Sequence, residues 1–266
     1  MKEAIGFLGA GNMGGALARA VAKAGYEVYL SNRRAEKTEA LAREIGPLAH
    51  PSDNARIAGS CRLVFLGVKP QVLRRAAAQI APILAGRKDR FVVVSMAAGV
   101  TLASLTEMLG GPALIRIMPN TPAAVGEGVL LYCTGGDVTE AEEDSFRKLM
   151  AGAGLCVKLE EGKIDMGSAV AGCGPAFVCL LMEAMIDAGV RCGLPRDKAK
   201  LFTLQTFAGT AKLALETGKD PAELRAAVCS PGGSTIEGVA ALEKDGARYA
   251  MLEAVAAAYK RTKELG

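Results

Sequence analysis

The chain has 266 residues, of which 50% are hydrophobic, and a formal net charge of +4. A chain of this length forms one or two domains, and its apolar share is enough to bury a core of Ala, Val and Leu. The charged residues are interleaved along the chain rather than collected in a basic block, which argues against a nucleic-acid-binding protein.

The chain begins with the pattern of a strand, a glycine-rich turn and a helix. Residues 5–8 are apolar, and Leu17, Val21 and Ala24 follow at helical spacing. The turn between them consists of Gly9, Ala10, Gly11, Asn12, Met13 and Gly14. Its first glycine permits a tight turn, the second lets the backbone approach a pyrophosphate, and the third lets the helix pack on the strand. We therefore predict that these residues bind a dinucleotide and do not form a purely structural turn.

The end of the second predicted strand, at residues 27–30, indicates which dinucleotide binds. The next positions are Ser31, Asn32, Arg33 and Arg34, with no acidic residue before position 36. A ribose 2′-hydroxyl is usually held by Asp or Glu at this point, whereas a 2′-phosphate needs hydroxyl, amide and guanidinium donors. This segment favours NADPH, with NADH still possible. The alternative is that the two arginines are only solvated residues at a helix start.

Strands and helices alternate to about residue 160. Strands are predicted at 62–68, 91–95, 114–118, 129–133 and 155–159, and helices at 71–84 and 140–150. The apolar runs are continuous, as in parallel strands covered on both faces, and turns follow them at the carboxyl edge where ligands bind. The fold class is thus α/β, with a Rossmann-type doubly wound sheet in a dinucleotide-binding domain of residues 1–161. For Asn120, a rigid turn and a ligand contact stay equally open.

Residues 162–266 are predicted as an all-helical domain. The helices cover 164–193, 196–216, 221–228 and 234–264, with a break near Gly246. A single thin layer of helices this rich in Ala, Leu and Met cannot bury all of its apolar side chains. We therefore expect a homodimer or a higher homo-oligomer. The longest uncharged stretch, 166–182, contains Gly174 and Pro175 and is shorter than the roughly 20 residues that cross a bilayer, so no membrane contact is expected.

The cysteines and the single histidine disfavour several kinds of site. The seven cysteines form no Cys-x-x-Cys pair and lie in apolar context, so we expect buried, reduced thiols and a cytoplasmic protein. His50 is the only histidine, which disfavours both a metal site and a histidine general base. We expect it on the surface, in a segment between strands. Residues 1–3 lead directly into the first strand, so no signal peptide is expected.

The most distinctive motif lies between two helical segments near the end of the chain. It reads Ser230, Pro231, Gly232, Gly233, Ser234 and Thr235. Pro231 has no N–H to donate, and the paired glycines permit positive φ and close approach of the backbone. Free amides and hydroxyls therefore collect at a helix start, where an anion binds. A capped helix turn without a ligand is the alternative for the motif on its own.

The motif closely resembles the signature of pyrroline-5-carboxylate reductases, Ser-Pro-Gly-Gly-x-Thr, followed by an apolar helix that ends in an acidic residue, here Glu243. The resemblance implies that Asn54 contacts the adenine-side ribose. It also implies that the nicotinamide and its ribose are bordered by Val68, Lys69, Pro70, Ala97, Ala98 and Gly99. The alternative interpretation of Lys69 is that it is a surface lysine that caps a helix. Residues 172–176 resemble another family segment, but Ala171 and Cys173 stand where serines are usual.

The resemblance spans essentially the whole chain and implies a pyrroline-5-carboxylate reductase that prefers NADPH. Such an enzyme reduces 1-pyrroline-5-carboxylate to L-proline, the final step of proline biosynthesis. We assign Thr235 as the catalytic residue that bonds the ring nitrogen, and Ser234 with the Gly232 and Gly233 amides as the carboxylate site. Glu161 lines the site by resemblance only. Because the imine nitrogen arrives protonated, catalysis needs mostly positioning.

Two other classes of function are weighed against this one. A β-hydroxyacid dehydrogenase has a similar glycine motif, but it carries a catalytic Lys with an Asn one helical turn later, and this chain has no asparagine after Asn120. A nucleotide-binding regulator without catalytic activity is disfavoured because the motif from Ser230 to Thr235 is intact.

Overall fold

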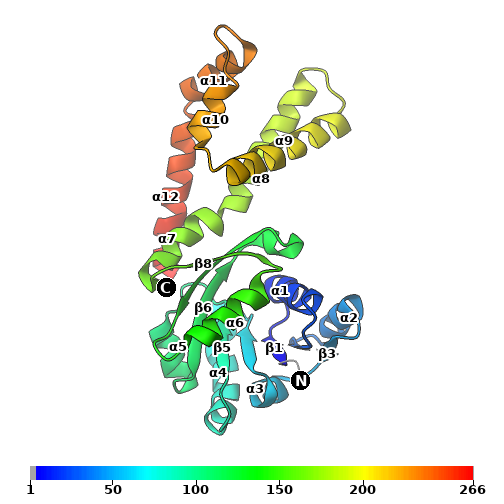
Figure 1. Cartoon of the computed structure of the whole chain (residues 1–266), viewed down its shortest axis with the longest axis vertical. Helices are drawn as coiled ribbons and strands as arrows, with labels where there is room; N and C mark the ends of the chain where they lie inside the picture. The colour runs from blue at the N-terminus through cyan, green and yellow to red at the C-terminus, as the bar shows by residue number, and fades with distance from the viewer. Residues whose placement is uncertain (1–3, 266) are drawn as a thin grey trace. The chain divides into compact units, whose positions relative to one another are not determined.

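The computed structural model describes residues 4–265, and its first part is a single eight-stranded sheet (Figure 1). The strand order is β3-β2-β1-β4-β5-β6-β7-β8. The strands are β1 (Ile5–Leu8), β2 (Val28–Ser31), β3 (Ala49–Pro51), β4 (Leu63–Leu66), β5 (Val92–Ser95), β6 (Ala113–Pro119), β7 (Gly128–Thr134) and β8 (Gly154–Lys158). The six strands from β1 to β6 are parallel, whereas β7 is antiparallel to β6 and parallel to β8. The order 3-2-1-4-5-6 is that of a dinucleotide-binding Rossmann sheet, so the predicted fold class is confirmed.

Helices cover both faces of this sheet. They are α1 (Asn12–Lys23), α2 (Ala35–Ile45), α3 (Asn54–Ser60), α4 (Pro70–Ala85), α5 (Leu102–Leu109) and α6 (Glu140–Met150), with the 3-10 turn η1 (Thr121–Val125). On one face Leu17 of α1 and Phe146 of α6 pack against Phe7 and Phe65, whose rings stack 4.5 Å apart. On the other face α3, α4 and α5 bury their apolar residues in a separate cluster. Burial on both faces explains the continuous apolar strands.

One strand was not expected from the sequence. Residues 49–51 form β3, so His50 lies within a strand and not between strands, and its ring lies 5.0 Å from that of Tyr29. Only three residues long and ending in a proline, β3 is an edge strand whose pattern is too short to be recognised. The other strands were predicted to within one or two residues at each end.

The chain divides into two compact units, residues 1–173 with 259–266, and Gly174–Ala258. The first unit includes α7 (Glu161–Ala171). The second unit contains α8 (Gly174–Arg191), α9 (Arg196–Thr217), α10 (Pro221–Ala227), α11 (Ser234–Lys244) and most of α12 (Ala247–Leu265). The predicted helix at 164–193 is therefore two helices, with a break at Gly172 and Cys173. The domain boundary predicted after residue 161 stays a prediction.

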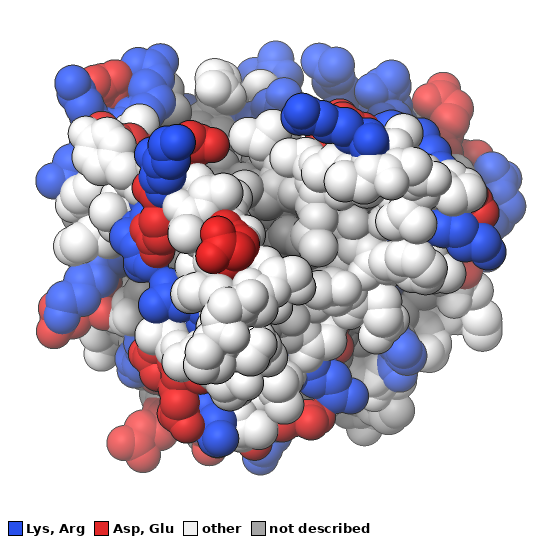
Figure 2. All heavy atoms as spheres, turned by 90° about the horizontal axis from the view of Figure 1, so that it is seen from above, with Lys and Arg blue, Asp and Glu red and all other residues white. Residues whose placement is uncertain are grey.

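The second unit buries almost none of its own side chains. Within α8, α10 and α11 no residue is buried, and α9 buries only Ala199 and Thr203. Large apolar side chains such as Leu180, Phe202 and Leu252 are exposed. Figure 2, which shows the chain from above, has uncharged residues over much of the face turned to the viewer. Such a surface on one chain indicates an interface.

Within the stretch Glu161–Arg191, an 18-residue window has a mean hydropathy of 1.9, which meets a length and hydropathy criterion for a membrane-crossing helix. The stretch comprises α7 and α8 and is interrupted between them. A single stretch of this kind is weak evidence for a membrane segment, since apolar helices that pair with other helices pass the same test.

Candidate active site

The glycine turn lies at the carboxyl ends of β1 and β4, where backbone segments meet too closely for side chains. Gly9 has a φ of +90°, and a Cβ there would lie 2.8 Å from the Gly67 carbonyl. A Cβ on Gly14 would lie 2.7 Å from the Gly9 oxygen. At Gly11, in contrast, the nearest atom to a Cβ would be 4.0 Å away, so this glycine faces open space. The first and third glycines thus serve packing, and the second leaves room for a ligand.

The start of α1 presents unpaired amides to that space. Gly11 is the N-cap, with an extended backbone and no side-chain cap, and the first intrahelical bond runs from the Gly15 amide to the Gly11 oxygen (2.7 Å). Among the hydrogen bonds within residues 4–265, none uses the amides of Asn12, Met13 or Gly14. These N–H groups and the positive end of the helix dipole suit a pyrophosphate.

The end of β2 holds the residues predicted to select the cofactor. The Ser31 hydroxyl donates to Asn54 Oδ1 at 2.5 Å, and the Asn54 amide reaches Gln79 Oε1 at 3.4 Å. Arg33 and Arg34 are exposed, and their guanidinium groups have no partner within residues 4–265. Arg34 is the N-cap of α2, so the pair opens that helix as the sequence suggested. Two unpaired guanidinium groups beside a helix N-terminus suit a phosphate group.

The ends of β4 and β5 carry the remaining residues that are predicted to contact the cofactor. Lys69 is the N-cap of α4, with Pro70 in the first turn, but its side chain makes no capping hydrogen bond and is exposed. Lys69 thus occupies the surface N-cap position that the alternative describes, and its contact with the nicotinamide or its ribose stays a prediction. After β5, Ala97 is buried and donates its amide to Ser95 Oγ, and Gly99 turns the chain with a φ of +73°. Val68 and Ala98 lie in the same two loops.

Glu161 has partners of its own in the first unit. Its Oε1 accepts the Leu102 amide at 2.6 Å and lies 3.4 Å from Arg116 Nη1. The same arginine bonds Asp165 Oδ1 at 2.8 Å and is only 2% exposed. The Glu161 carboxylate, 33% exposed, thus joins α7 to the first residue of α5. Its assigned role in lining the substrate site stays a prediction.

Asn120 also has a structural role. Its Oδ1 accepts the Val129 amide at 2.8 Å, and its Nδ2 donates to the Ala171 carbonyl at 2.9 Å. The residue is 7% exposed, so the rigid-turn interpretation fits better than the ligand contact. Arg116, Asp165 and the bonds of Asn120 were missed from the sequence. An arginine within an apolar strand was the available signal, because a buried charge requires partners.

The motif from Ser230 to Thr235, predicted to bind the substrate, forms a turn followed by a helix start in the second unit. The Gly233 amide donates to the Ser230 carbonyl at 3.0 Å, and Gly232 has a φ of +66°. Gly233 caps α11 without a side-chain bond, and in the described part of the chain the amides of Ser234, Thr235 and Ile236 have no acceptor. The Ser234 and Thr235 side chains are exposed. The motif therefore presents three amides and two hydroxyls together.

Glu243, at the other end of α11, is not a free carboxylate. It accepts hydrogen bonds from Arg248 and lies 3.5 Å from Arg225. The hydrogen bond from Arg248 lowers the pKa of its carboxyl group. The resemblance implies that Glu243 lines the site, and this role stays a prediction. In the structure its carboxylate already has two basic partners, Arg248 and Arg225.

The cysteines differ in exposure, and none forms a disulfide in the described residues. Cys61 and Cys133 are buried and Cys156 is half-buried, as expected. Burial raises the pKa of each of these three thiols to about 11, which makes them poor nucleophiles. Cys179 on α8 and Cys192 directly after this helix are exposed, against expectation. No cluster of three metal-ligating side chains is found in residues 4–265.

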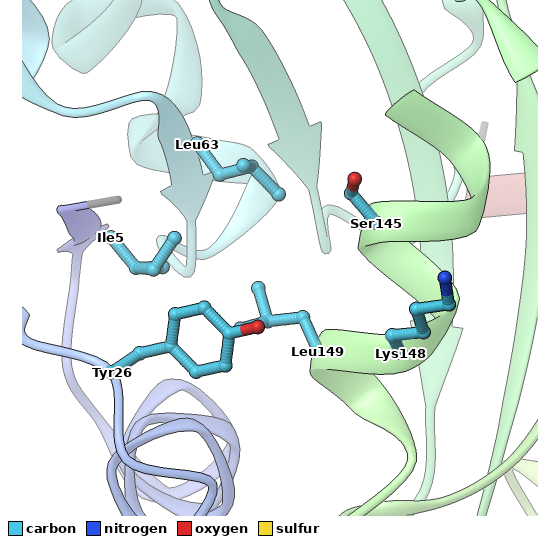
Figure 3. Close-up of a pocket in the computed structure, with 6 residues that line it drawn as sticks. All are labelled: Ile5, Tyr26, Leu63, Ser145, Lys148 and Leu149. Carbon is cyan, nitrogen blue, oxygen red and sulfur yellow. The ribbon is translucent and has the colours of Figure 1, made fainter. Parts of the chain in front are cut away.

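A small hollow at the other edge of the sheet is distinct from these sites. It has a volume of about 80 Å³ and lies at the first residues of β1 and β4 (Figure 3). Its lining residues are Ile5, Tyr26, Leu63, Ser145, Lys148 and Leu149. The glycine turn follows the last residue of β1, at the opposite end of the strand.

Comparisons with known proteins agree over the full chain. A family model for pyrroline-5-carboxylate reductase dimerisation matches residues 161–265, and one for NADP oxidoreductases, coenzyme F420-dependent, matches residues 4–99. A pyrroline-5-carboxylate reductase of Synechocystis is 40% identical and covers 100% of this chain and 99% of its own length. The soybean (Glycine max) enzyme is 38% identical, over 98% and 95%.

Solved structures give the same result. The pyrroline-5-carboxylate reductase of Coxiella burnetii superposes with a TM-score of 0.90 at 32% identity, covering 100% of this chain and 99% of that one. The Plasmodium falciparum pyrroline carboxylate reductase, solved with NADP bound, gives 0.87 at 30% identity, over 99% and 98%. The glycine turn, the Rossmann strand order, the helical second half and these full-length relatives lead to one conclusion: the chain belongs to the pyrroline-5-carboxylate reductase family.

Proposed function

We propose that this protein reduces 1-pyrroline-5-carboxylate to L-proline with NADPH as the preferred cofactor, the final step of proline biosynthesis. The observation that supports this most is the pair of helix starts with unpaired amides. One lies at α1 beside an open glycine, and the other at α11 beside two hydroxyls. Family membership adds independent support, since its full-length relatives carry this enzyme name.

The residues of the first unit fit NADPH. The α1 amides and the open space at Gly11 suit the pyrophosphate, and the two unpaired arginines suit the 2′-phosphate. The loops at Val68–Pro70 and Ala97–Gly99 border the nicotinamide and its ribose. When bound, the cofactor supplies a hydride to the imine carbon.

The second unit supplies the substrate groups. The substrate carboxylate accepts hydrogen bonds from the Ser234 hydroxyl, the Gly232 amide and the free amides at the start of α11. The Gly233 amide, assigned to the carboxylate from the sequence, is instead bonded to the Ser230 carbonyl. The Thr235 hydroxyl bonds the ring nitrogen. No protein group needs to remove a proton, because the imine arrives protonated and hydride addition neutralises it. The chain contributes orientation and charge stabilisation.

The helical half, residues 162–266, is proposed as the substrate-binding and dimerisation domain of a homodimer or larger homo-oligomer. Its unburied apolar helices and the match to a dimerisation family model support this. Unpaired cysteines support a reducing compartment, which we take to be the cytoplasm.

The direct test is a turnover assay with the purified full chain. NADPH absorbance should fall on addition of 1-pyrroline-5-carboxylate, and mass spectrometry should identify proline as the product. NADH should support the reaction with a higher KM. Absence of proline, with either cofactor and with correctly folded protein, would exclude this function.

A further inference from the structure

The side chain of Asn32 connects two loops that are proposed to bind the cofactor. One is the glycine turn, proposed for the pyrophosphate, and the other is the segment after β2, proposed for the 2′-phosphate. The Asn32 Nδ2 donates to the Ala10 carbonyl, in the glycine turn, at 3.0 Å. Its Oδ1 accepts the backbone amide of Arg34, the N-cap of α2, at 3.3 Å. One carboxamide thus joins the pyrophosphate turn to the start of the helix that carries the arginines.

Backbone bonds already tie the same two loops at one point. The amides of Gly9 and Ala10 both donate to the Ser31 carbonyl, at 3.0 and 2.9 Å. These bonds fix the turn against the end of β2, but they do not reach beyond Ser31. The Asn32 side chain extends the connection to Arg34. Asn32 and Arg34, the two neighbours of Arg33, are thereby held against each other and against the glycine turn.

Half of the hydrogen-bonding capacity of the Asn32 carboxamide is used within the protein. A carboxamide offers two N–H donors and an oxygen with two lone pairs, and one of each is engaged here. The residue is half-buried, whereas Arg33 and Arg34 are exposed. Its geometry is that of a brace between loops, which differs from the direct phosphate donor suggested by its place in the sequence.

We infer that Asn32 is a positioning residue that holds the glycine turn and the arginine loop in the cofactor-binding arrangement. The inference rests on the proposed function, since it concerns the same cofactor. A direct ligand of the 2′-phosphate affects NADPH alone. A residue that positions the turn affects every dinucleotide, because the pyrophosphate is common to NADPH and NADH. Loss of preorganised geometry weakens binding without altering the chemical step.

The test measures the Kd values of NADP⁺ and NAD⁺ by calorimetry for the full chain and for Asn32→Ala. We expect both Kd values to rise roughly ten-fold, the worth of one to two net hydrogen bonds. The kcat at saturating cofactor should stay within about two-fold of wild type. Arg33→Ala is the matched control, because its side chain has no partner in residues 4–265, and it should weaken NADP⁺ binding only.

A second variant, Asn32→Asp, is isosteric and keeps the acceptor for the Arg34 amide, so it gives the measurement if the alanine variant folds poorly. It loses the donor to Ala10, and we expect weaker NAD⁺ binding. If position 32 contacted the ribose directly, the new carboxylate would instead improve NAD⁺ binding. Loss of NADP⁺ affinity alone in Asn32→Ala, or a gain of NAD⁺ affinity in Asn32→Asp, would overturn the inference. A wild-type chain that binds neither dinucleotide would overturn the proposed function itself.

Discussion

Arg116 on β6 lies 2.8 Å from Asp165 on α7, and it is the largest fully buried side chain in the first unit. Glu161, one helical turn before Asp165, shares the same guanidinium group. Both carboxylates lie on one face of α7, four residues apart, so one arginine fixes the helix onto the sheet. The ion pairs therefore set the direction in which the chain leaves the Rossmann sheet.

The first prediction concerns this arginine. Arg116→Met should lower the free energy of unfolding by about 2 to 4 kcal/mol, because it leaves two carboxylates without their common partner. Urea unfolding at one fixed protein concentration measures the loss. Glu161→Gln, which keeps the Asp165 pair, should cost clearly less. Equal stability of wild type and Arg116→Met would contradict the anchoring role.

Glu142 gives a second prediction, on acid stability. Hydrogen bonds from Arg90, with further bonds from the Thr139 amide and hydroxyl, lower the pKa of its carboxyl group from 4.5 to about 2. Because the folded-state pKa is depressed, the stabilisation is complete above about pH 4.5 and is lost as the pH falls toward 2. The contribution is about 1 to 3 kcal/mol, since Arg90 is partly exposed.

Urea unfolding at pH 7 and pH 3 tests this dependence. Glu142→Gln should be less stable than wild type at pH 7, and the difference should shrink at pH 3. Glu44→Gln is a suitable control, because Glu44 pairs with Arg19 on the exposed surface and should contribute little at either pH. If the difference in the free energy of unfolding between wild type and Glu142→Gln is the same at both pH values, the Glu142 charge does not contribute to stability.

The third prediction uses the different surroundings of the glycines. Gly11→Asp should abolish dinucleotide binding while the melting temperature hardly changes, because the side chain enters open space and repels the pyrophosphate. Gly14→Asp should instead prevent stable folding, since a Cβ would lie 2.7 Å from the Gly9 oxygen. Calorimetric titration with NADP⁺ and thermal melting separate the two effects. Normal NADP⁺ affinity in Gly11→Asp would exclude this turn as the pyrophosphate site.

The glycine turn was predictable from the sequence because its physics is local. A strand, three glycines and a helix start are contiguous, and no distant residue is needed to understand them. The alternation of strands and helices was predictable for a similar reason, since each apolar run and its following turn repeat one pattern. No local sequence pattern indicates that β7 is antiparallel to β6, because this direction depends on the η1 turn that leads into β7.

The connections over long sequence distances were not predictable in this way. Arg116 and Asp165 are 49 positions apart, and Asn32 reaches Ala10 across 22 positions. Nothing near Asn32 in the sequence distinguishes a ligand contact from a brace between loops. The same holds for Asn120, whose partners lie on β7 and α7. Only the packed structure assigns the bonds of these polar side chains.

The fourth prediction tests the hydroxyl of Thr235. Thr235→Val keeps the shape of the side chain but removes the hydroxyl oxygen that accepts the N–H of the protonated ring, so kcat/KM should fall by about 10- to 1000-fold, as for one hydrogen bond that acts in the transition state. NADPH affinity should hardly change. Thr235→Ser retains the hydroxyl and should keep most of the activity. Near wild-type turnover in the valine variant would remove Thr235 from the proposed mechanism.

The last prediction is that the active site is completed only in a dimer. The helices of the second unit leave large apolar side chains exposed on one chain, and a second copy is the partner we propose for them. If each site takes its glycine turn from one chain and its Thr235 motif from the other, two inactive variants can complement each other. Gly11→Asp and Thr235→Val, refolded together in equal amounts, should regain about one quarter of wild-type activity, because half of the dimers are mixed and each has one intact site.

The glycine variant suits this experiment because it does not disturb packing, whereas a substitution at Gly9 would clash with the Gly67 backbone. Light scattering and native mass spectrometry establish the dimer and the mixed species. Mixed dimers that show no activity above the two parent variants would place each site within a single chain. An active monomer at assay concentration would exclude the obligate dimer, because its apolar helices would then need no second copy.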